Sequence, residues 1–198
     1  MRRHKFMSLA LVSFAISCSV PERPAAPAPR PIAARGPRNP ADDIVGLLSS
    51  YMTGLAPFEL RRTARAILVE SARNHVDARL VLAVMHTESG FYNFSRSPVG
   101  ALGLMQIMPA TGEMLAREAG LDWSGPDDLF IPDLNVRLGT RYLALLHARY
   151  GTWQKALAAY NWGPAALDRR LADGNQVPEL YVHTVYSRLA TVSRSAKN

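Results

Sequence analysis

The segment from which the fold can be read is Arg79-Leu80-Val81-Leu82-Ala83-Val84-Met85-His86-Thr87-Glu88-Ser89-Gly90. Its apolar residues at positions 81, 84 and 85 recur at helical spacing, and Glu88 falls on the same face. Asp77, just before the run, has the side chain that a helix N-cap requires. The segment therefore predicts a helix from Asp77 to Glu88. The Glu88 carboxylate is expected to face the protein interior, together with the apolar side chains of the helix.

Glu88 is the first candidate for chemistry because of where this helix puts it. Burial disfavours a charged carboxylate, and the negative pole of the helix dipole disfavours it further, so both effects raise the pKa. An acid that keeps its proton near neutral pH is what a general acid needs. The alternative is an ordinary residue at a helix end whose carboxylate reaches solvent, because buried carboxylates are rare.

Two later segments bear on this choice. They read Gly-Ala-Leu-Gly-Leu-Met-Gln-Ile-Met-Pro over 100–109 and Ala-Tyr-Asn-Trp-Gly-Pro over 159–164. Together with Glu88-Ser89-Gly90-Phe91, this ordered set resembles the family 1 lytic transglycosylases, whose soluble-lytic-transglycosylase (SLT) domain has a goose-lysozyme-like fold. The resemblance covers about 60–190 and implies a mainly α, lysozyme-like helical domain.

Helical periodicity independently predicts helices over most of the chain after residue 42. The expected helices span 60–75, 77–88, 109–120, 134–150, 153–160, 164–173 and 178–192. Asp133 and Thr152 are expected N-caps, and the helix over 134–150 is expected to bury Leu138, Tyr142, Leu145 and Leu146. The acidic stretch 122–131 is expected to be a polar loop, and the Gly- and Pro-rich stretch near 95–104 allows a small hairpin.

The resemblance also implies site residues. They are Glu88 as the catalytic acid, with Ser97, Gln106, Met108, Tyr160, Asn161 and Tyr181 around the sugar. Gln106 is expected to bond an acetamido group through both its donor and its acceptor, and Tyr160 to position Glu88. Trp162 stands where the family more often has Ala, and is expected either to stack on a sugar ring or to cover the cleft floor. The segment before Tyr181 is shorter than the family pattern.

The beginning of the chain reads as a targeting segment. Residues 1–17 have a basic start and a short apolar run, which predicts a signal peptide. Cys18, the only cysteine, follows Ala15-Ile16-Ser17, which resembles a lipobox and predicts lipidation; the alternative is a plain cleavage site with an incidental cysteine. The proline-rich stretch 18–41 is then a tether, and 42–198 the transglycosylase domain. This predicts a periplasmic lipoprotein, with Ser19 favouring the outer membrane.

Charge and composition exclude other classes of protein. Residues 1–40 carry seven Arg or Lys and one Glu, which accounts for +6 of the formal charge of +7. The remaining chain is nearly neutral and has no basic face for nucleic acid. The histidines show no spacing typical of zinc ligands, and no cofactor is expected.

The expected substrate is the peptidoglycan glycan strand, cut at the MurNAc-β-1,4-GlcNAc bond. Most glycosidases use two carboxylates, but the motifs contain only Glu88. One acid suffices if the N-acetyl oxygen attacks its own anomeric carbon and the 6-hydroxyl then closes a 1,6-anhydro ring. The rivals are a hydrolytic lysozyme on the same fold and a non-catalytic wall-binding or scaffold component, with envelope or secretion-machinery partners.

Overall fold

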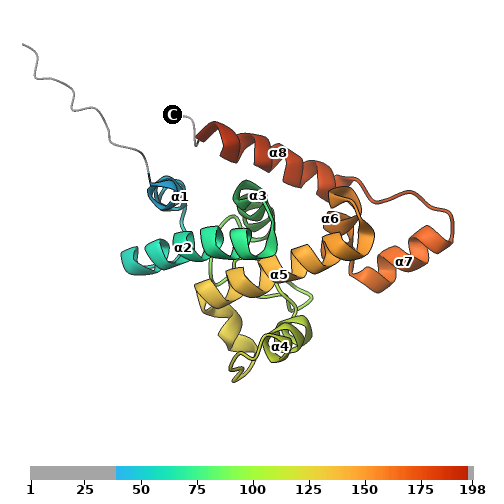
Figure 1. Ribbon diagram of the computed structural model, residues 1–198, viewed down its shortest axis with the longest axis horizontal. Helices are drawn as coiled ribbons and strands as arrows, with labels where there is room; N and C mark the ends of the chain where they lie inside the picture. The colour runs from blue at the N-terminus through green and yellow to red at the C-terminus, as the bar shows by residue number, and fades with distance from the viewer. Residues whose placement is uncertain (1–38, 196–198) are drawn as a thin grey trace, which may run out of the picture. The chain divides into compact units, whose positions relative to one another are not determined.

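The computed structural model describes residues 39–195 as helices joined by loops, with no strand among those residues (Figure 1). The signal peptide, Cys18 and nearly all of the proline-rich tether lie outside the described residues. Over 39–195, no helix combines the length and the apolar character that a membrane span requires. The mainly α fold that the sequence predicts is therefore confirmed for this part of the chain.

Helix α3 (Ala78–Ser89) is the central element. Asp77 caps its N-terminus by accepting a hydrogen bond from the Arg79 backbone N–H (2.8 Å), as predicted, and Gly90 ends it in the left-handed conformation. All six residues over 80–85 are buried, so the helix is enclosed on every side instead of presenting one apolar stripe. Helices α2 (Pro57–Asn74) and α8 (Leu180–Ser195) pack against it.

Helix α5 (Pro132–Tyr150) is the second long element, and it packs against α2 and α6 (Trp153–Trp162). The sequence wrongly predicts Asp133 as its N-cap. The helix begins at Pro132, two residues before the predicted start, and Asp133 instead pairs with Arg62 of α2 at 2.7 Å. Leu145 was also predicted to be buried but is 42% exposed, and Leu143 lies in the core in its place.

Proline sets the start of many of these helices. Within residues 39–195, helices begin at Pro40 (α1, Pro40–Ser49), Pro57, Pro109 (α4, Pro109–Glu118), Pro126 (η1, Pro126–Phe130), Pro132 and Pro164 (α7, Pro164–Ala172). Proline is suited to the first helical position because its fixed φ is helical and its missing N–H would have no partner there. Pro40 and Ala41, assigned to the tether by sequence, are therefore the first turn of α1. Similarly, the predicted loop over 122–131 contains the 3-10 helix η1.

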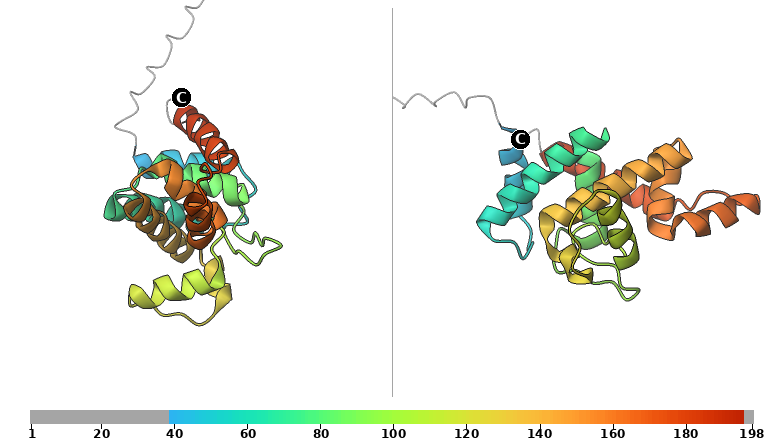
Figure 2. Two further views of the ribbon diagram at one scale, coloured as in Figure 1. Left: turned by 90° about the vertical axis from the view of Figure 1, so that its right-hand side faces the viewer. Right: turned by 60° about the horizontal axis from the view of Figure 1, so that its bottom comes forward.

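The long loop between α3 and α4 (light green in Figure 2) is irregular, and its stretch over 101–105 is buried whereas residues 98–100 are exposed. Only two isolated bridges give it hairpin character, Arg96 with Leu102 and Leu102 with Ile107. Asn135 of α5 is fully buried beneath the loop: it accepts from the Met105 N–H (2.8 Å) and donates to the Leu102 (3.1 Å) and Leu129 (2.8 Å) carbonyls. The loop lies so close to Asn135 that a Cβ on Gly103 would be 2.3 Å from its amide nitrogen.

Candidate active site

Glu88 occupies the last turn of α3, with its carboxylate largely removed from solvent. Burial raises the pKa of Glu88 from an ordinary value of 4.5 to about 7, and a hydrogen bond from Tyr181 opposes the rise. The carboxyl group is thus turned inward, instead of reaching solvent as an ordinary helix-end residue would. With a pKa near 7, both the acid and the base form are populated at neutral pH, as a group that must first give and then accept a proton requires.

Tyr181, in the first turn of α8, is the residue that contacts Glu88 directly. Its hydroxyl donates a hydrogen bond of 2.5 Å to Glu88 Oε1. Burial, reinforced by the nearby Glu88 charge, raises the pKa of Tyr181 well above its ordinary value, so the phenol remains a neutral donor. The shortened segment before Tyr181 therefore still brings the tyrosine to the acid.

Tyr160 lies close to Glu88 but does not bond to it. Its hydroxyl donates to the Met105 carbonyl (2.8 Å), and its ring packs 5.5 Å from that of Tyr142. Burial and the Glu88 charge raise the pKa of Tyr160 well above its ordinary value. The expected direct positioning of Glu88 by Tyr160 is thus corrected: Tyr160 holds the loop beside the acid, and Tyr181 holds the acid.

Ser89 is a site residue that the sequence analysis missed. Its hydroxyl lies 2.8 Å from the Leu104 carbonyl and 3.1 Å from the Met85 carbonyl, so it joins the end of α3 to the loop. The available signal was its position: a small polar residue directly after the acid, at the end of a buried helix. Ser89 and Tyr160 together bind the consecutive carbonyls of Leu104 and Met105.

Gln106 has less hydrogen-bonding capacity for a ligand than the sequence suggested. Its Nε2 donates to the Ser95 (3.0 Å) and Gly103 (2.9 Å) carbonyls, and its backbone is left-handed at φ 47°. Both amide hydrogens are therefore used within the loop, and only Oε1 remains to accept from a ligand. Ser97 is also engaged, because its hydroxyl oxygen accepts from the Ala101 N–H (2.9 Å), which leaves its own hydrogen free to donate.

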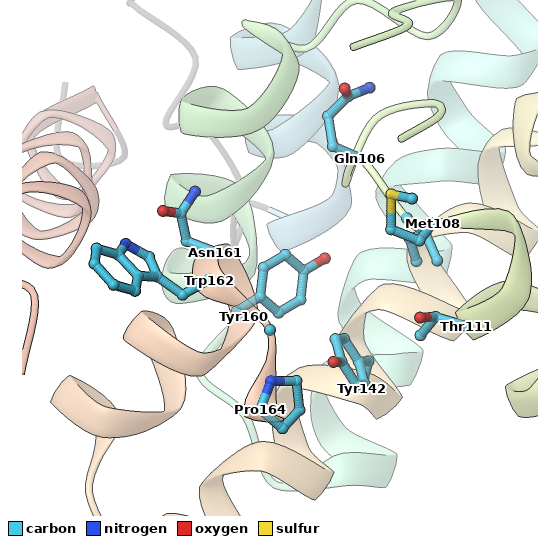
Figure 3. A pocket seen from close by; sticks show the side chains of 10 residues that line it. Gln106, Met108, Thr111, Tyr142, Tyr160, Asn161, Trp162 and Pro164 are labelled. Atoms are coloured by element: carbon cyan, nitrogen blue, oxygen red, sulfur yellow. The ribbon is translucent and has the colours of Figure 1, made fainter. Parts of the chain in front are cut away.

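A pocket of about 330 Å³ lies between the loop and the end of α6 (Figure 3). Figure 3 shows Met108 and Thr111 on one side of it, and Asn161 on the other, with the ring of Tyr160 between them. Of the predicted site residues, Gln106, Met108, Tyr160 and Asn161 line this pocket, whereas Glu88, Ser97 and Tyr181 are not part of its lining. Thr111, Tyr142 and Pro164 also line it, and the sequence analysis had not placed them in the site.

Four acidic residues that could serve as a second carboxylate have partners of their own. Asp127 pairs with Arg96 (3.1 Å), Asp128 accepts from the Ser124 N–H (2.6 Å), and Asp133 pairs with Arg62. Glu179, which directly precedes α8, lies 3.5 Å from His183 of that helix, and both side chains are exposed. Over 39–195, no three His, Cys, Asp or Glu side chains lie together in a way that could hold a metal ion.

Comparisons with known proteins find related sequences. Residues 65–179 match the transglycosylase SLT domain. The chain is 35% identical over 146 residues to the membrane-bound lytic murein transglycosylase C of Histophilus somni, covering 65% of this chain and 40% of that protein. It is 38% identical over 85 residues to the soluble lytic murein transglycosylase of Escherichia coli, covering 42% of this chain and 13% of that protein.

The same fold is found in solved structures. An inactive mutant of the lytic transglycosylase Slt from Pseudomonas aeruginosa superimposes with a TM-score of 0.59 at 28% identity, over 67% of this chain and 24% of that one. The 70 kDa soluble lytic transglycosylase of Escherichia coli gives 0.54 at 21% identity, over 79% and 28%. This chain therefore spans less than half the length of each of these relatives.

The raised pKa of Glu88 makes stability depend on pH in a defined direction. The pKa of Glu88 is 4.5 in the unfolded chain and about 7 in the folded protein, so between these pH values Glu88 ionises more readily in the unfolded chain. Raising the pH through this range therefore lowers the free energy of unfolding by up to about 3 kcal/mol. Glu88→Gln removes this cost and keeps an acceptor for Tyr181. The variant should unfold at higher urea than wild type at pH 8, with the difference vanishing near pH 4.

Glu113→Gln, at an exposed position on α4, gives the background from removing one negative charge together with its exposed ion pair to Arg117. A Glu88→Gln variant whose added stability was the same at pH 4 and pH 8 would contradict the burial of an ionisable acid.

Proposed function

We infer that this chain, which belongs to the transglycosylase SLT domain family, is a peptidoglycan lytic transglycosylase with Glu88 as its acid and base. The single observation that carries the proposal is a largely buried Glu88 with a pKa near 7, bonded to Tyr181, beside the loop over 100–109. The names of the relatives, lytic murein transglycosylases, support the same reaction and the same substrate.

The reaction begins with Glu88 protonated. Glu88 donates its proton to the oxygen that joins MurNAc to GlcNAc, while the N-acetyl oxygen of MurNAc attacks the anomeric carbon and the glycosidic bond breaks. The resulting Glu88 carboxylate accepts the proton of the MurNAc 6-hydroxyl, and that oxygen displaces the N-acetyl oxygen to close the 1,6-anhydro ring. Atoms balance without water, and Glu88 ends protonated and ready for another turnover.

The neighbouring residues have separate parts in this scheme. Tyr181 donates to Glu88 in both states, and its bond limits how far burial raises the pKa of the acid. Substrate is bound by the free Oε1 of Gln106, which accepts an acetamido N–H, and by the free hydroxyl hydrogen of Ser97, which donates to a sugar oxygen. Met108 and Asn161, which line the pocket, contact the sugar ring.

A hydrolytic lysozyme is the main rival within the same fold. Hydrolysis with two carboxylates needs a second acid within about 5–9.5 Å of the first. Asp127, Asp128 and Asp133 are engaged in an ion pair or in the 122–131 turn, and this favours the anhydro route. A purely wall-binding or scaffold role is less well supported, because simple binding does not require an acid held near its neutral form.

The digestion of purified sacculi tests the function. The wild-type protein should release muropeptides that carry 1,6-anhydro ends, one water lighter than hydrolytic products by mass spectrometry. Glu88→Gln should fold normally and lose about a thousandfold in turnover, because no proton donor remains. Products with reducing ends would identify a lysozyme, and near-normal release by the folded variant would exclude Glu88 as the acid.

The two tyrosines provide a second test, through the pH dependence of turnover. Activity should fall as pH rises through about 7, because Glu88 must be protonated to act as an acid. Tyr181→Phe removes a bond that lowers the pKa of Glu88, so this alkaline limb should move to higher pH. Tyr160→Phe is the matched control, since its hydroxyl bonds Met105: the rate should fall while the limb stays in place.

An equal shift of the limb in both variants would mean that the hydroxyl groups act through general packing. No shift in Tyr181→Phe would mean that its bond to Glu88 is not made in the active enzyme.

We also propose that the protein is a periplasmic lipoprotein, acylated at Cys18 after removal of residues 1–17 and tethered by 18–41, with the outer membrane as its site. Its support is the lipobox-like Ala15-Ile16-Ser17-Cys18 and the membrane-bound relative from Histophilus somni. Multiple acyl chains give lasting attachment where one chain is marginal.

Fractionation of cells tests the anchor. The wild-type protein should fractionate with outer membranes, and Cys18→Ala with the soluble periplasm. A soluble wild-type protein would refute acylation and leave the catalytic proposal intact.

A further inference from the structure

Two exposed aromatic side chains stand on the loop directly after α3, outside the site described above. Tyr92 is 45% exposed and Phe94 is 51% exposed, and their rings pack edge to face with centroids 6.1 Å apart. Aromatic rings of this size are normally removed from water, so two adjacent exposed rings mark a surface with a binding role. We call this pair the aromatic platform.

The platform is held rigid by the residue between its two members. Asn93 is almost fully buried: its N–H donates to the Thr53 carbonyl (2.9 Å) and its side-chain amide to the Phe130 carbonyl (2.8 Å). Both rings also lie against Gly54, where an added Cβ would be 3.1 Å from the Phe94 ring and 3.2 Å from the Tyr92 ring. Two segments far from the platform in sequence, 53–54 and Phe130, therefore fix it, and little conformational entropy would be lost on binding.

The edge of the platform is polar and charged. Phe130 lies 5.8 Å from the Phe94 ring, and its face is covered by the guanidinium group of Arg96 at 4.5 Å. Arg96 in turn pairs with Asp127, and both side chains are exposed. An aromatic surface bordered by charges and hydrogen-bonding groups suits a hydroxylated polymer better than a lipid bilayer.

The platform stands on the same loop as several residues of the proposed active site and is connected to them at both of its ends. At one end the Tyr92 N–H donates to the carbonyl of Ser89 (3.0 Å), the residue after Glu88. At the other end the carbonyl of Ser95, next to Phe94, accepts from Gln106 Nε2 (3.0 Å). The platform is therefore tied by hydrogen bonds of its flanking residues to the end of α3 and to Gln106, two parts of the proposed site.

We propose that Tyr92 and Phe94 form an additional saccharide-binding subsite, which stacks on a sugar ring of the same glycan strand beyond the pair that is cleaved. The inference rests on the proposed function. A pyranose ring presents an apolar C–H face, and a flat aromatic surface removes that face from water. The pocket of about 330 Å³ is at the small end for ligand sites, so a polymeric substrate needs contacts outside it.

The test uses the full-length protein in two forms. Binding of purified sacculi is measured in the Glu88→Gln background, where the polymer stays intact, and cleavage is measured in the active protein. The double variant Tyr92→Ala with Phe94→Ala should bind sacculi about tenfold more weakly and show a correspondingly raised KM with kcat unchanged, because only ground-state contacts are lost. Tyr92→Phe with Phe94→Tyr keeps both rings and should restore wild-type values.

Tyr186→Ala is the matched control, because this exposed tyrosine of α8 points about 140° around the helix from Tyr181. It should bind and cleave as the parent does. Unchanged sacculus binding and an unchanged KM in the double variant overturn the proposal. If the double variant also loses binding to phosphatidylglycerol vesicles, the platform binds lipid, and the saccharide proposal is again overturned. A parent protein that cleaves nothing would refute the proposed function, while the binding measurement would still decide on the platform.

Discussion

The site depends on how the backbone of a buried, irregular loop satisfies its hydrogen bonds. Backbone N–H and C=O groups removed from water need partners, and the loop between α3 and α4 has almost no ladder to provide them. Turn-like backbone hydrogen bonds satisfy part of the loop, and side chains from three helices supply further partners. Ser89 of α3 binds the Leu104 carbonyl, Asn135 of α5 binds Leu102 and Met105, and Tyr160 of α6 binds the Met105 carbonyl. Each such bond left unmade would cost about 1–3 kcal/mol.

Because motif residues bond to the loop backbone, some of them have fewer hydrogen-bonding groups available to a ligand than their side chains contain. Gln106 uses both amide hydrogens inside the loop, in a left-handed conformation that is uncommon for a residue with a side chain. Tyr160 uses its hydroxyl on Met105. Gln106 keeps one acceptor for a ligand, and Ser97 keeps one donor. A few groups in fixed positions are what orientation of a sugar requires.

Glu88 differs from Gln106, because its buried carboxylate has one hydrogen-bonding partner and not several. That partner, Tyr181, comes from a helix 93 residues further along the chain. A neutral phenol stabilises the carboxylate less than a cation would, so the pKa stays near 7 instead of falling. The packing of α8 on α3 therefore sets both the fold of the core and the protonation state of the acid.

The sequence alone determined features that depend on near neighbours. Asp77 and Thr152 cap helices as expected, the segment 79–88 is helical, and Glu88 points inward, because capping and periodicity act over one or two turns. The ordered motifs were also sufficient for the family.

Only the tertiary structure decided which polar groups meet. In the folded protein Tyr181, and not Tyr160, bonds Glu88, and Asp133 pairs with Arg62 and does not cap α5. Leu145 is exposed, and Asn135 lies under the loop. The reason is geometric: a hydrogen bond tolerates only a few tenths of an ångström. Partners 30 to 93 residues apart therefore meet or miss according to how the helices pack, which no local pattern encodes.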